Sequence, residues 1–518
     1  MLVPNAPRTA ATVAIVGGGA VGAALFYSLA ERFSSDASLR AKTRVVLFEK
    51  SERIGPGLAY APDLAPYLLN QSARTMSLVP GHRSHFCEWL GARGIELPED
   101  EARACPRHLF GDYVASCFVR ALDGARRDGL SVTTIRDEVS ALVPRRLGGY
   151  RVLTGVHAPV DADIVVLAVG SLPSTRFRAA LGGPGFVASP YPSAEMCARI
   201  PPGARVAILG SGLSAIDAAL ALFAAGHQAP VTMASRGGLL PAVRGSLRPC
   251  ELHHVTRTNV SRATDHGRRP LPLTTVVDWL ALELERHGVS VSWDRDFPAW
   301  VDPLDHYASQ VAAAERGPRA WQAIGEALNP MMEVVWHHLG EDDRRLFLDR
   351  FYSRFMSYWV PIPLGTARRV LTLLREGRLS VERQLTDVVL DAESGEYRLR
   401  FPGRVATSDF VVDATGAPRH LQDCDSPLLQ SLLRQGTITA QSSGGLRVDF
   451  DSLRALGAGG RPDPSLFAIG NLTSGTHLFT STLEFNVLKA DRVAARIVSE
   501  LHRRSDKDHH AESPADPT

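Results

Sequence analysis

The sequence predicts an α/β fold built from two parallel-sheet units and a helical insertion. Two glycine-rich turns indicate the sheet units: residues 13–25 read VAIVGGGAVGAAL, and residues 206–222 read VAILGSGLSAIDAALAL. Each turn follows a short apolar run typical of a buried strand and precedes a helical pattern. A third stretch, residues 251–380, is rich in helix formers and carries apolar residues at helical spacing, which indicates the insertion.

The first turn has the G-x-G-x-x-G spacing of dinucleotide-binding Rossmann units. Gly17 permits the tight turn, Gly19 lets the backbone approach a pyrophosphate, and Gly22 allows the helix to pack closely on the strand. The next strand, RVVLFEK, ends in Glu49, where an acid bonds the ribose hydroxyls. The predicted dinucleotide contacts of this first unit are Gly17, Gly19, Ala20, Val21, Gly22 and Glu49.

The second turn predicts a second dinucleotide, with Gly210, Gly212 and Ser214 at its phosphates. The strand after it, PVTMAS, ends at Ser235 and Arg236 without an acid. A carboxylate there would repel a 2′-phosphate, whereas a guanidinium binds phosphate in a bidentate manner, so this pair predicts NADPH. The alternative is that Arg236 is a solvated turn arginine. Two such sites in one chain are typical of a flavin reduced by a nicotinamide.

The pattern of strands and helices divides the chain into six segments. Strands return after the helical stretch at DVVLDAESGEYRLRF and SDFVVDATG, and a last strand, SLFAIGN, precedes a long helix. The expected segments are the first part of the FAD unit (1–175), the NADPH unit (200–250), the helical insertion (251–380), the return of the NADPH unit (381–420), the C-terminal part of the FAD unit (421–502) and a polar, disordered tail (503–518).

Composition argues against several classes of protein. The formal net charge of +2 over 518 residues gives no electrostatic footprint for nucleic acid. None of the six cysteines forms C-x-x-C, which argues against a disulfide reductase, a metal ribbon or a secreted disulfide framework. No apolar run reaches membrane-spanning length and the N-terminus reads as strand and turn, so we expect a cytoplasmic protein. The adjacent pairs His253–His254 and His337–His338 lack ligand spacing, so no metal is expected.

Further segments accompany the glycine-rich turns: GPGLAYAPDLAPYLLNQSARTMS, HFCEWL, PRHLFGDY, SRGGLLP, VDATG and AIGNLTSGTHLFTS. Together they resemble a bacterial group of FAD/NAD(P)-binding proteins related to class B flavin monooxygenases and amino-acid N-hydroxylases. The resemblance spans most of the chain and is least distinct in the central helical part. Some members of the group resemble aspartate N-monooxygenases, which make nitrosuccinate.

The resemblance implies an FAD- and NADPH-dependent monooxygenase that uses flavin C4a-hydroperoxide chemistry. It implies O2 and a small amino-acid-like substrate, with N-hydroxylation of an aspartate-like amino acid in specialised metabolism preferred. A flavin enzyme without oxygenation, such as a dehydrogenase or an oxidase, is the alternative. A non-catalytic nucleotide-binding protein is a third reading, which the intact glycines of both turns disfavour. A homodimer remains open.

The resemblance also carries roles over to single residues. Leu69, Asn70, Gln71, Ser72 and Met76 are expected along the isoalloxazine ring, with Asn70 and Ser72 as the catalytic candidates. The alternative for these two is an ordinary satisfied turn. Gly470, Asn471 and the turn to Thr480 are expected near the pyrimidine end of the flavin, although many flavoproteins have aspartate where Asn471 stands.

A substrate carboxylate would need cationic partners. The arginines that fall in or near these segments or the insertion are Arg74, Arg83, Arg107, Arg244 and Arg354, each with the alternative of a surface role. An aromatic series at helical spacing is interpreted as core, with the substrate pocket as the alternative: Phe347, Phe351, Tyr352, Phe355, Tyr358 and Trp359. His85 is interpreted as a core or capping histidine.

Overall fold

The computed structural model describes residues 10–64, 67–97, 105–175, 182–246 and 248–512, with side chains up to residue 504. Its first unit is built on a six-stranded sheet that is parallel except at one edge. In sheet order its strands are β16 (Arg454–Leu456), β17 (Pro462–Ala468), β7 (Ile164–Leu167), β1 (Ala11–Val16), β2 (Thr43–Phe48) and β3 (Ser131–Ile135). N-terminal and C-terminal segments therefore share one sheet, as expected for the FAD unit.

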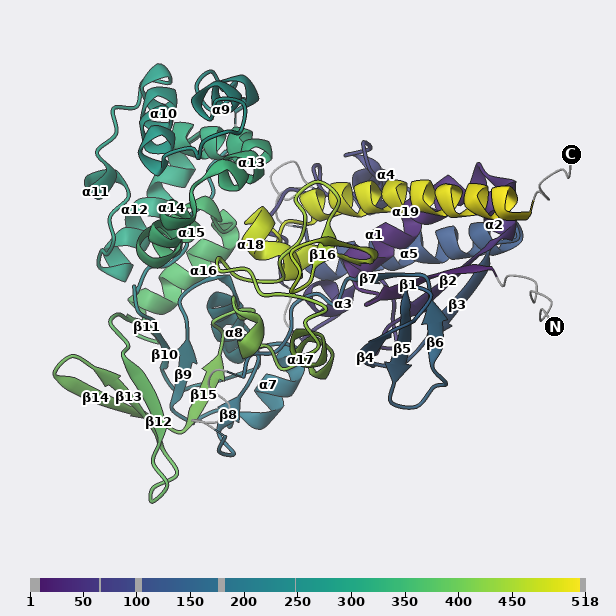
Figure 1. Ribbon diagram of the computed structural model, residues 1–518. Coiled ribbons are helices and arrows are strands. Elements are labelled where there is room, and N and C mark those ends of the chain that lie inside the picture. The colour runs from purple at the N-terminus through teal and green to yellow at the C-terminus, as the bar shows by residue number, and fades with distance from the viewer. Residues whose placement is uncertain (1–9, 65–66, 98–104, 176–181, 247, 513–518) are drawn as a thin grey trace, which may run out of the picture.

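Alternation along β1 fixes which layer covers each face of this sheet. Val13 and Ile15 pack against three helices, α1 (Ala20–Ser34), α5 (Arg107–Arg127) and α19 (Leu483–Glu512), which lie side by side in Figure 1. Ala14 and Val16 face α17 (Pro427–Arg434) and a small antiparallel sheet. That small sheet consists of β4 (Val139–Pro144), β5 (Tyr150–Thr154) and β6 (Val160–Ala162).

The second unit is a five-stranded parallel sheet. Its order is β11 (Leu379–Glu382), β10 (Val231–Ala234), β9 (Val206–Leu209), β15 (Phe410–Asp413) and β8 (Phe186–Val187). Helices α7 (Ser193–Arg199), α8 (Leu213–Ala224), α12 (Pro303–Arg316) and α16 (Leu364–Arg375) share a core with one face. The antiparallel strands β12 (Asp387–Leu390), β13 (Tyr397–Phe401) and β14 (Arg404–Ser408) cover the other.

The insertion is helical, as predicted, but two of its helices belong to the second unit. Its own core gathers around Trp336 and Leu328 of α13. The remaining helices of the insertion are α9 (Arg257–Ala263), α10 (Leu273–Arg286), α11 (Trp293–Asp296), α13 (Ala320–His338), α14 (Glu341–Leu346), the π-helical turn η2 (Phe347–Phe351) and α15 (Tyr352–Trp359). Leu478 and Phe479 complete this core from the C-terminal part of the first unit, so the insertion packs on that unit (Figure 1).

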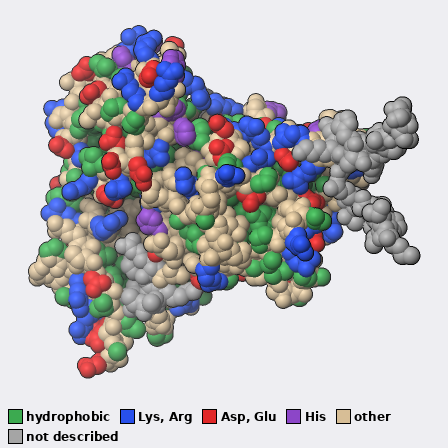
Figure 2. All heavy atoms as spheres, viewed as in Figure 1, with side chains coloured by type: hydrophobic (Ala, Val, Ile, Leu, Met, Phe, Trp, Pro, Cys, Tyr) green, Lys and Arg blue, Asp and Glu red, His purple; other side chains and the backbone are tan. Residues whose placement is uncertain are grey.

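Short elements connect these layers: α2 (Ala37–Ala41), α3 (Gly57–Tyr60), α4 (His85–Gly91), η3 (Leu421–Asp423), η4 (Gly470–Thr473) and α18 (Ser474–His477). Figure 2 shows basic and acidic side chains interspersed over the visible face, in keeping with the near-neutral net charge. Within the described ranges, no helix combines the length and the apolar character that crossing a membrane requires.

Two expected boundaries need correction. The second unit begins before residue 200, because β8 is already hydrogen-bonded to β15 and Met196 of α7 lies in its core. The tail expected to be disordered from residue 503 is helical over residues 503–512, because α19 continues to Glu512. Residues 513–518 of that predicted tail lie outside the described residues.

Candidate functional site

The first glycine turn is too tight for any side chain at two of its positions. Gly17 has φ +103°, and a Cβ added there would lie 2.4 Å from the carbonyl oxygen of Ala168. A Cβ on Gly22 would lie 1.9 Å from the carbonyl oxygen of Gly17. Gly19 is extended and caps the N-terminus of α1. The turn thus has the geometry that the spacing predicted, with backbone N–H groups at the start of a helix.

Glu49 lies against this turn from the end of β2. Its Oε2 accepts a hydrogen bond from the backbone N–H of Gly18 at 2.7 Å, and its Oε1 accepts from the N–H and the hydroxyl of Ser51 at 2.8 and 2.6 Å. The side chain is half-buried, and a carboxylate has capacity for further donors. This placement fits a ribose beside the turn, and the binding role of Glu49 stays a prediction.

The second turn leaves open space where a diphosphate would lie. Gly210 has φ +114°, and its added Cβ would lie 2.9 Å from the carbonyl oxygen of Ala414, whereas an added Cβ on Gly212 meets nothing within 4 Å. Gly212 caps the twelve-residue helix α8, whose free N–H groups and dipole favour an anion. A cradle of this kind fits a dinucleotide.

Sequence reasoning chose Ser214 at this turn and missed Ala215. Ala215 is fully buried in the core beneath the sheet and takes the place that Gly22 has in the first unit. The signal was present, because G-x-G-x-x-A is an accepted form of the same spacing.

The end of β10 separates the two residues of the predicted NADPH-selecting pair. The hydroxyl of Ser235 lies 2.9 Å from that of Ser211 and accepts the N–H of Gly238 at 2.9 Å, so it serves the turn. Arg236 is exposed. Arg383, at the end of neighbouring β11, is also exposed, and its guanidinium lies 4.0 Å from the centre of the Trp300 ring. Sequence reasoning missed Arg383, because only strand pairing brings it beside Arg236.

The C-terminal turn meets the first glycine turn. A Cβ on Gly470 would lie 3.7 Å from the side chain of Val21, at the start of α1. The amide of Asn471 donates to the hydroxyl of Ser171 at 3.3 Å and accepts from that of Thr480 at 3.1 Å. The three C-terminal residues predicted for the flavin thus lie together, next to Ser171 in the segment that follows β7.

The segment from Leu69 to Met76 lies at the junction of both units. Leu69 and Met76 are buried, and Asn70, Gln71 and Ser72 are half-buried. The carbonyl oxygen of Asn70 accepts a hydrogen bond at 2.8 Å from Arg244, which follows β10 of the second unit. The hydroxyl of Ser72 accepts the N–H of Arg74 at 3.3 Å, which is a turn contact. The catalytic roles of Asn70 and Ser72 stay predictions.

Four of the five candidate arginines are already paired. Their ion pairs are Arg83–Glu484 (2.6 Å), Arg107–Asp217 (3.0 Å), Arg244–Glu326 (2.8 Å) and Arg354–Asp294 (3.2 Å). Arg74 is exposed and forms no ion pair within the part of the chain that the structure describes. It is therefore the candidate that a substrate carboxylate could engage without breaking an existing pair.

Part of the aromatic series forms a wall beside the C-terminal turn. The ring of Trp359 stacks on Phe479 with centroids 5.7 Å apart and planes 9° apart, and Phe355 stacks on both. The indole N–H of Trp359 donates to Asn329 at 3.2 Å. Tyr358 instead lies buried against Phe297 in the insertion. The series is thus divided between core and this wall, except for Phe351, which is 43% exposed and was wrongly predicted as core.

A buried charge cluster joins the insertion to the same turn. Glu333 of α13 accepts a hydrogen bond from Nδ1 of the fully buried His477, and its other oxygen lies 3.3 Å from Nζ of Lys489. Burial raises the pKa of Glu333, but the hydrogen bond from His477 and the charge of Lys489 outweigh it and lower the pKa to about 2. Trp336 also donates to the carbonyl of Gly475 at 2.9 Å.

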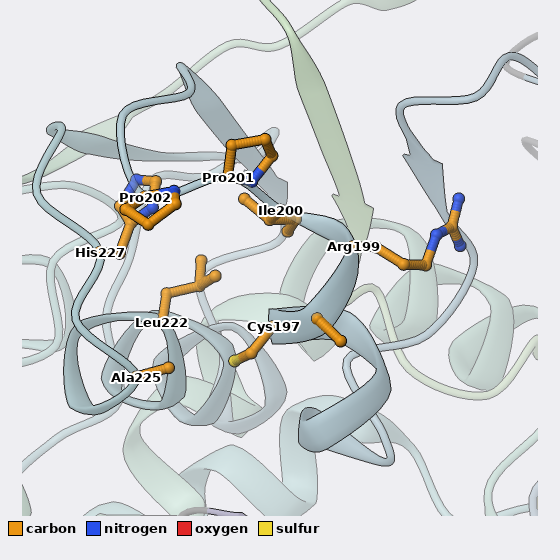
Figure 3. A pocket seen from close by; sticks show the side chains of 9 residues that line it. Cys197, Arg199, Ile200, Pro201, Pro202, Leu222, Ala225 and His227 are labelled. Carbon is orange, nitrogen blue, oxygen red and sulfur yellow. The ribbon is translucent and has the colours of Figure 1, made fainter.

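A hollow in the second unit lies away from the glycine turns. Cys197, Leu222 and His227 line it together with the loop at Pro201, which precedes β9, whereas Gly210 follows β9 (Figure 3). The hollow is therefore at the N-terminal end of β9, whereas the predicted NADPH site is at its C-terminal end. No group of three or more His, Cys, Asp or Glu side chains among the described residues could hold a metal ion, and the six cysteines are free thiols.

Comparisons with known proteins agree with this architecture. Residues 14–172 match the FAD-NAD(P)-binding family. An uncharacterized protein of Escherichia coli K12, YdhS, is 22% identical over 480 residues, which cover 82% of this chain and 86% of that protein. The N-terminal part of the first sheet unit, expected to bind a dinucleotide, is thus the part that matches this family.

Solved structures of amino-acid N-hydroxylating flavoenzymes share the fold over nearly the whole chain. Ornithine hydroxylase of Pseudomonas aeruginosa is 16% identical with a TM-score of 0.57, covering 95% of this chain and 100% of that one. L-lysine 6-monooxygenase of Pseudomonas syringae is 21% identical with a TM-score of 0.55, covering 95% and 99%. Ornithine N-hydroxylase of Kutzneria sp. 744, solved with reduced FAD, NADP+ and L-ornithine, is 16% identical with a TM-score of 0.54, covering 96% and 100%. The predicted fold class is confirmed, and so is the resemblance of the chain to this group, which these structures show at the level of the fold.

Proposed function

We propose that the protein is an FAD- and NADPH-dependent monooxygenase that N-hydroxylates a small, aspartate-like amino acid in specialised metabolism. The observation that carries the proposal is that one chain holds two glycine turns of dinucleotide-binding geometry and connects the units that carry them. A Cβ on Gly470 would lie 3.7 Å from the side chain of Val21 at the first glycine turn, and the carbonyl oxygen of Asn70 accepts a hydrogen bond from Arg244 of the second unit. Two nucleotide cradles in connected units are suited to hydride transfer between their cofactors.

The chain's own residues fit both cofactors. Gly17, Gly22 and Glu49 would hold the FAD diphosphate and ribose, and Gly212 with Arg236 would hold the phosphates of NADPH. Bound FAD would supply the group that accepts a hydride from NADPH and that then activates oxygen. The protein would position the substrate and keep bulk water away, for which the stacked rings of Trp359 and Phe479 are suited.

The substrate class rests on Arg74, which forms no ion pair with any residue that the structure describes. A carboxylate-bearing amino acid needs a cation, and Arg74 offers one directly after the Asn70–Ser72 segment without breaking an ion pair. The substrate amine must be neutral when it is oxidised, and an apolar pocket lowers the pKa of an amine by disfavouring its charged form. The solved N-hydroxylases of the same fold act on ornithine or lysine, so these amino acids belong in any test together with aspartate.

The test is NADPH consumption by the purified, FAD-loaded protein with aspartate, glutamate, ornithine, lysine or no amino acid. Hydroxylamine products, nitrite and hydrogen peroxide are measured in parallel. We expect one carboxylate-rich amino acid to stimulate consumption and to yield an N-oxidised product with little peroxide. Consumption that yields only peroxide for every amino acid would refute N-hydroxylation of these substrates and favour the non-oxygenating alternative.

A further inference from the structure

A buried cluster of charged and aromatic side chains joins the two nucleotide units. Arg107, the first residue of α5, lies 3.0 Å through Nη1 from Oδ2 of Asp217 on α8, and both side chains are at most 15% exposed. Tyr191 donates its hydroxyl to the same oxygen at 2.6 Å. The ring of Tyr67 packs edge-on against Tyr191 and lies 5.2 Å from the guanidinium of Arg107.

A second set of bonds runs parallel to this cluster. Asp63 of the first unit accepts the hydroxyl of Ser193 at 2.7 Å and its N–H at 2.8 Å, and it accepts the N–H of Ala194 at 3.1 Å. Ser193 begins α7, whose core is shared with the second sheet. The first unit therefore holds the second through two helices, α7 and α8.

Both ends of the Arg107–Asp217 pair lead directly to a predicted cofactor contact. The backbone N–H of Arg107 donates to the carbonyl of Tyr67 at 2.7 Å, and its guanidinium donates to the carbonyl of Leu68 at 3.3 Å, immediately before Leu69 and Asn70. Asp217 lies one helical turn after Leu213, at the start of the helix that Gly212 caps. The pair thus connects the flavin segment to the phosphate-binding helix of the second unit.

Stability alone does not explain the pair. Burial raises the pKa of Asp217 even though Arg107 and Tyr191 favour its charged form. The same contact acts in the opposite direction on the pKa of Arg107, which is raised despite burial because Asp217 favours the charged guanidinium. Buried ion pairs are often replaced by apolar side chains without loss of stability. A buried ion pair can instead favour one defined arrangement of the two helices that carry its partners, here α5 and α8.

We propose that Arg107 and Asp217 are positioning residues that fix the second nucleotide unit against the first and thereby set the approach of the nicotinamide to the flavin. The expected effect on the rate of hydride transfer rests on the proposed function, whereas the expected effect on the arrangement of the two units does not. A misplacement of about 1 Å between reacting groups costs about 10²-fold in rate. Removing the charge of Asp217 should slow hydride transfer without weakening either nucleotide site.

The test compares Asp217→Asn with Asp491→Asn. Asp491 forms a bidentate pair with Arg32 at 2.7 and 3.1 Å, and both residues lie on helices of the first unit, so this control breaks an ion pair that does not cross between units. Arg107→Lys, which keeps the charge but loses the planar fork, is the second variant. Flavin reduction by NADPH is followed anaerobically, and small-angle X-ray scattering reports the arrangement of the units.

The expected result is a reduction rate at least tenfold lower in Asp217→Asn and lowered less in Arg107→Lys, with the FAD content and the KM for NADPH within about twofold of wild type. Scattering should show a broader distance distribution for Asp217→Asn alone. A wild-type rate or wild-type scattering in Asp217→Asn overturns the proposal, as does an equal loss in Asp491→Asn. If NADPH fails to reduce the wild-type protein, the proposed function fails, and scattering alone then decides on the Arg107–Asp217 pair.

Discussion

Replacing Gly22 by Ala tests the geometry of the first glycine turn. The added Cβ would lie 1.9 Å from the carbonyl oxygen of Gly17, and α1 must retreat by more than an ångström to bring that contact to 3.0 Å. No rotamer relieves a clash between a methyl group and a backbone carbonyl. Forcing an extra carbon into a packed site costs about 1–3 kcal/mol, while alanine gains about 1 kcal/mol over glycine inside a helix.

We expect Gly22→Ala to lose about 1 kcal/mol of the free energy of unfolding, the difference between these opposing terms. The larger effect is on FAD, because the retreat of α1 moves the N–H groups that face the diphosphate. The assay is the ratio of flavin absorbance to protein after purification, together with urea unfolding of the FAD-free protein. We expect FAD content to fall at least tenfold.

Gly124→Ala is the matched control, since Gly124 lies inside α5 and an added Cβ there meets nothing within 4 Å. It should keep its FAD and gain about 0.5–1 kcal/mol of stability. If Gly22→Ala holds FAD as well as Gly124→Ala does and is stabilised to the same extent, the close packing of α1 on the Gly17 turn has been misjudged.

Three further predictions concern single side chains. Arg236→Ala should raise the KM for NADPH about 10–100-fold and leave the KM for NADH unchanged, because only NADPH carries the 2′-phosphate; equal effects on both nucleotides would contradict that role. Arg74→Ala should raise the KM for the amino-acid substrate, whereas Arg83→Ala should not, since Arg83 is paired with Glu484; steady-state kinetics with the substrate found in the panel decide this. The ionised carboxylate of Glu333 should stabilise the fold above pH 4.5, its pKa in the unfolded chain, and this contribution should be lost as the pH falls toward the folded-state pKa of about 2. The urea unfolding midpoints of wild type and Glu333→Gln should therefore converge below pH 4.5. A constant difference between the two midpoints across that range would show that the ionisation of Glu333 does not contribute to stability.

Local spacing made the glycine turns and their strands predictable. The turn itself requires glycine at positions 17, 22 and 210, because a Cβ at Gly17, Gly22 or Gly210 would clash with a backbone carbonyl oxygen. Any chain with this spacing meets the same steric requirement. Glu49 was predictable for the same reason, because a strand end fixes its place relative to the turn. The helical insertion followed from apolar periodicity over a long stretch.

Pairings between distant segments were not predictable. Arg107 was a candidate for binding the substrate carboxylate, but its guanidinium is paired with Asp217 on α8. Nothing near Arg107 in the sequence reveals that partner. Arg383 follows β11 and lies near Arg236 only because β10 and β11 pair. Residues 503–512 are polar in composition and still continue α19, because the apolar residues before them already commit that helix against α1.

Anaerobic mixing of the FAD-loaded protein with NADPH is the decisive measurement, because flavin reduction requires two nucleotide sites that exchange a hydride within one chain. We expect the oxidised flavin absorbance to bleach in proportion to the NADPH consumed, and to bleach faster with NADPH than with NADH. If the protein binds FAD but keeps its oxidised spectrum with either nucleotide, it is not a flavoenzyme reduced by a nicotinamide.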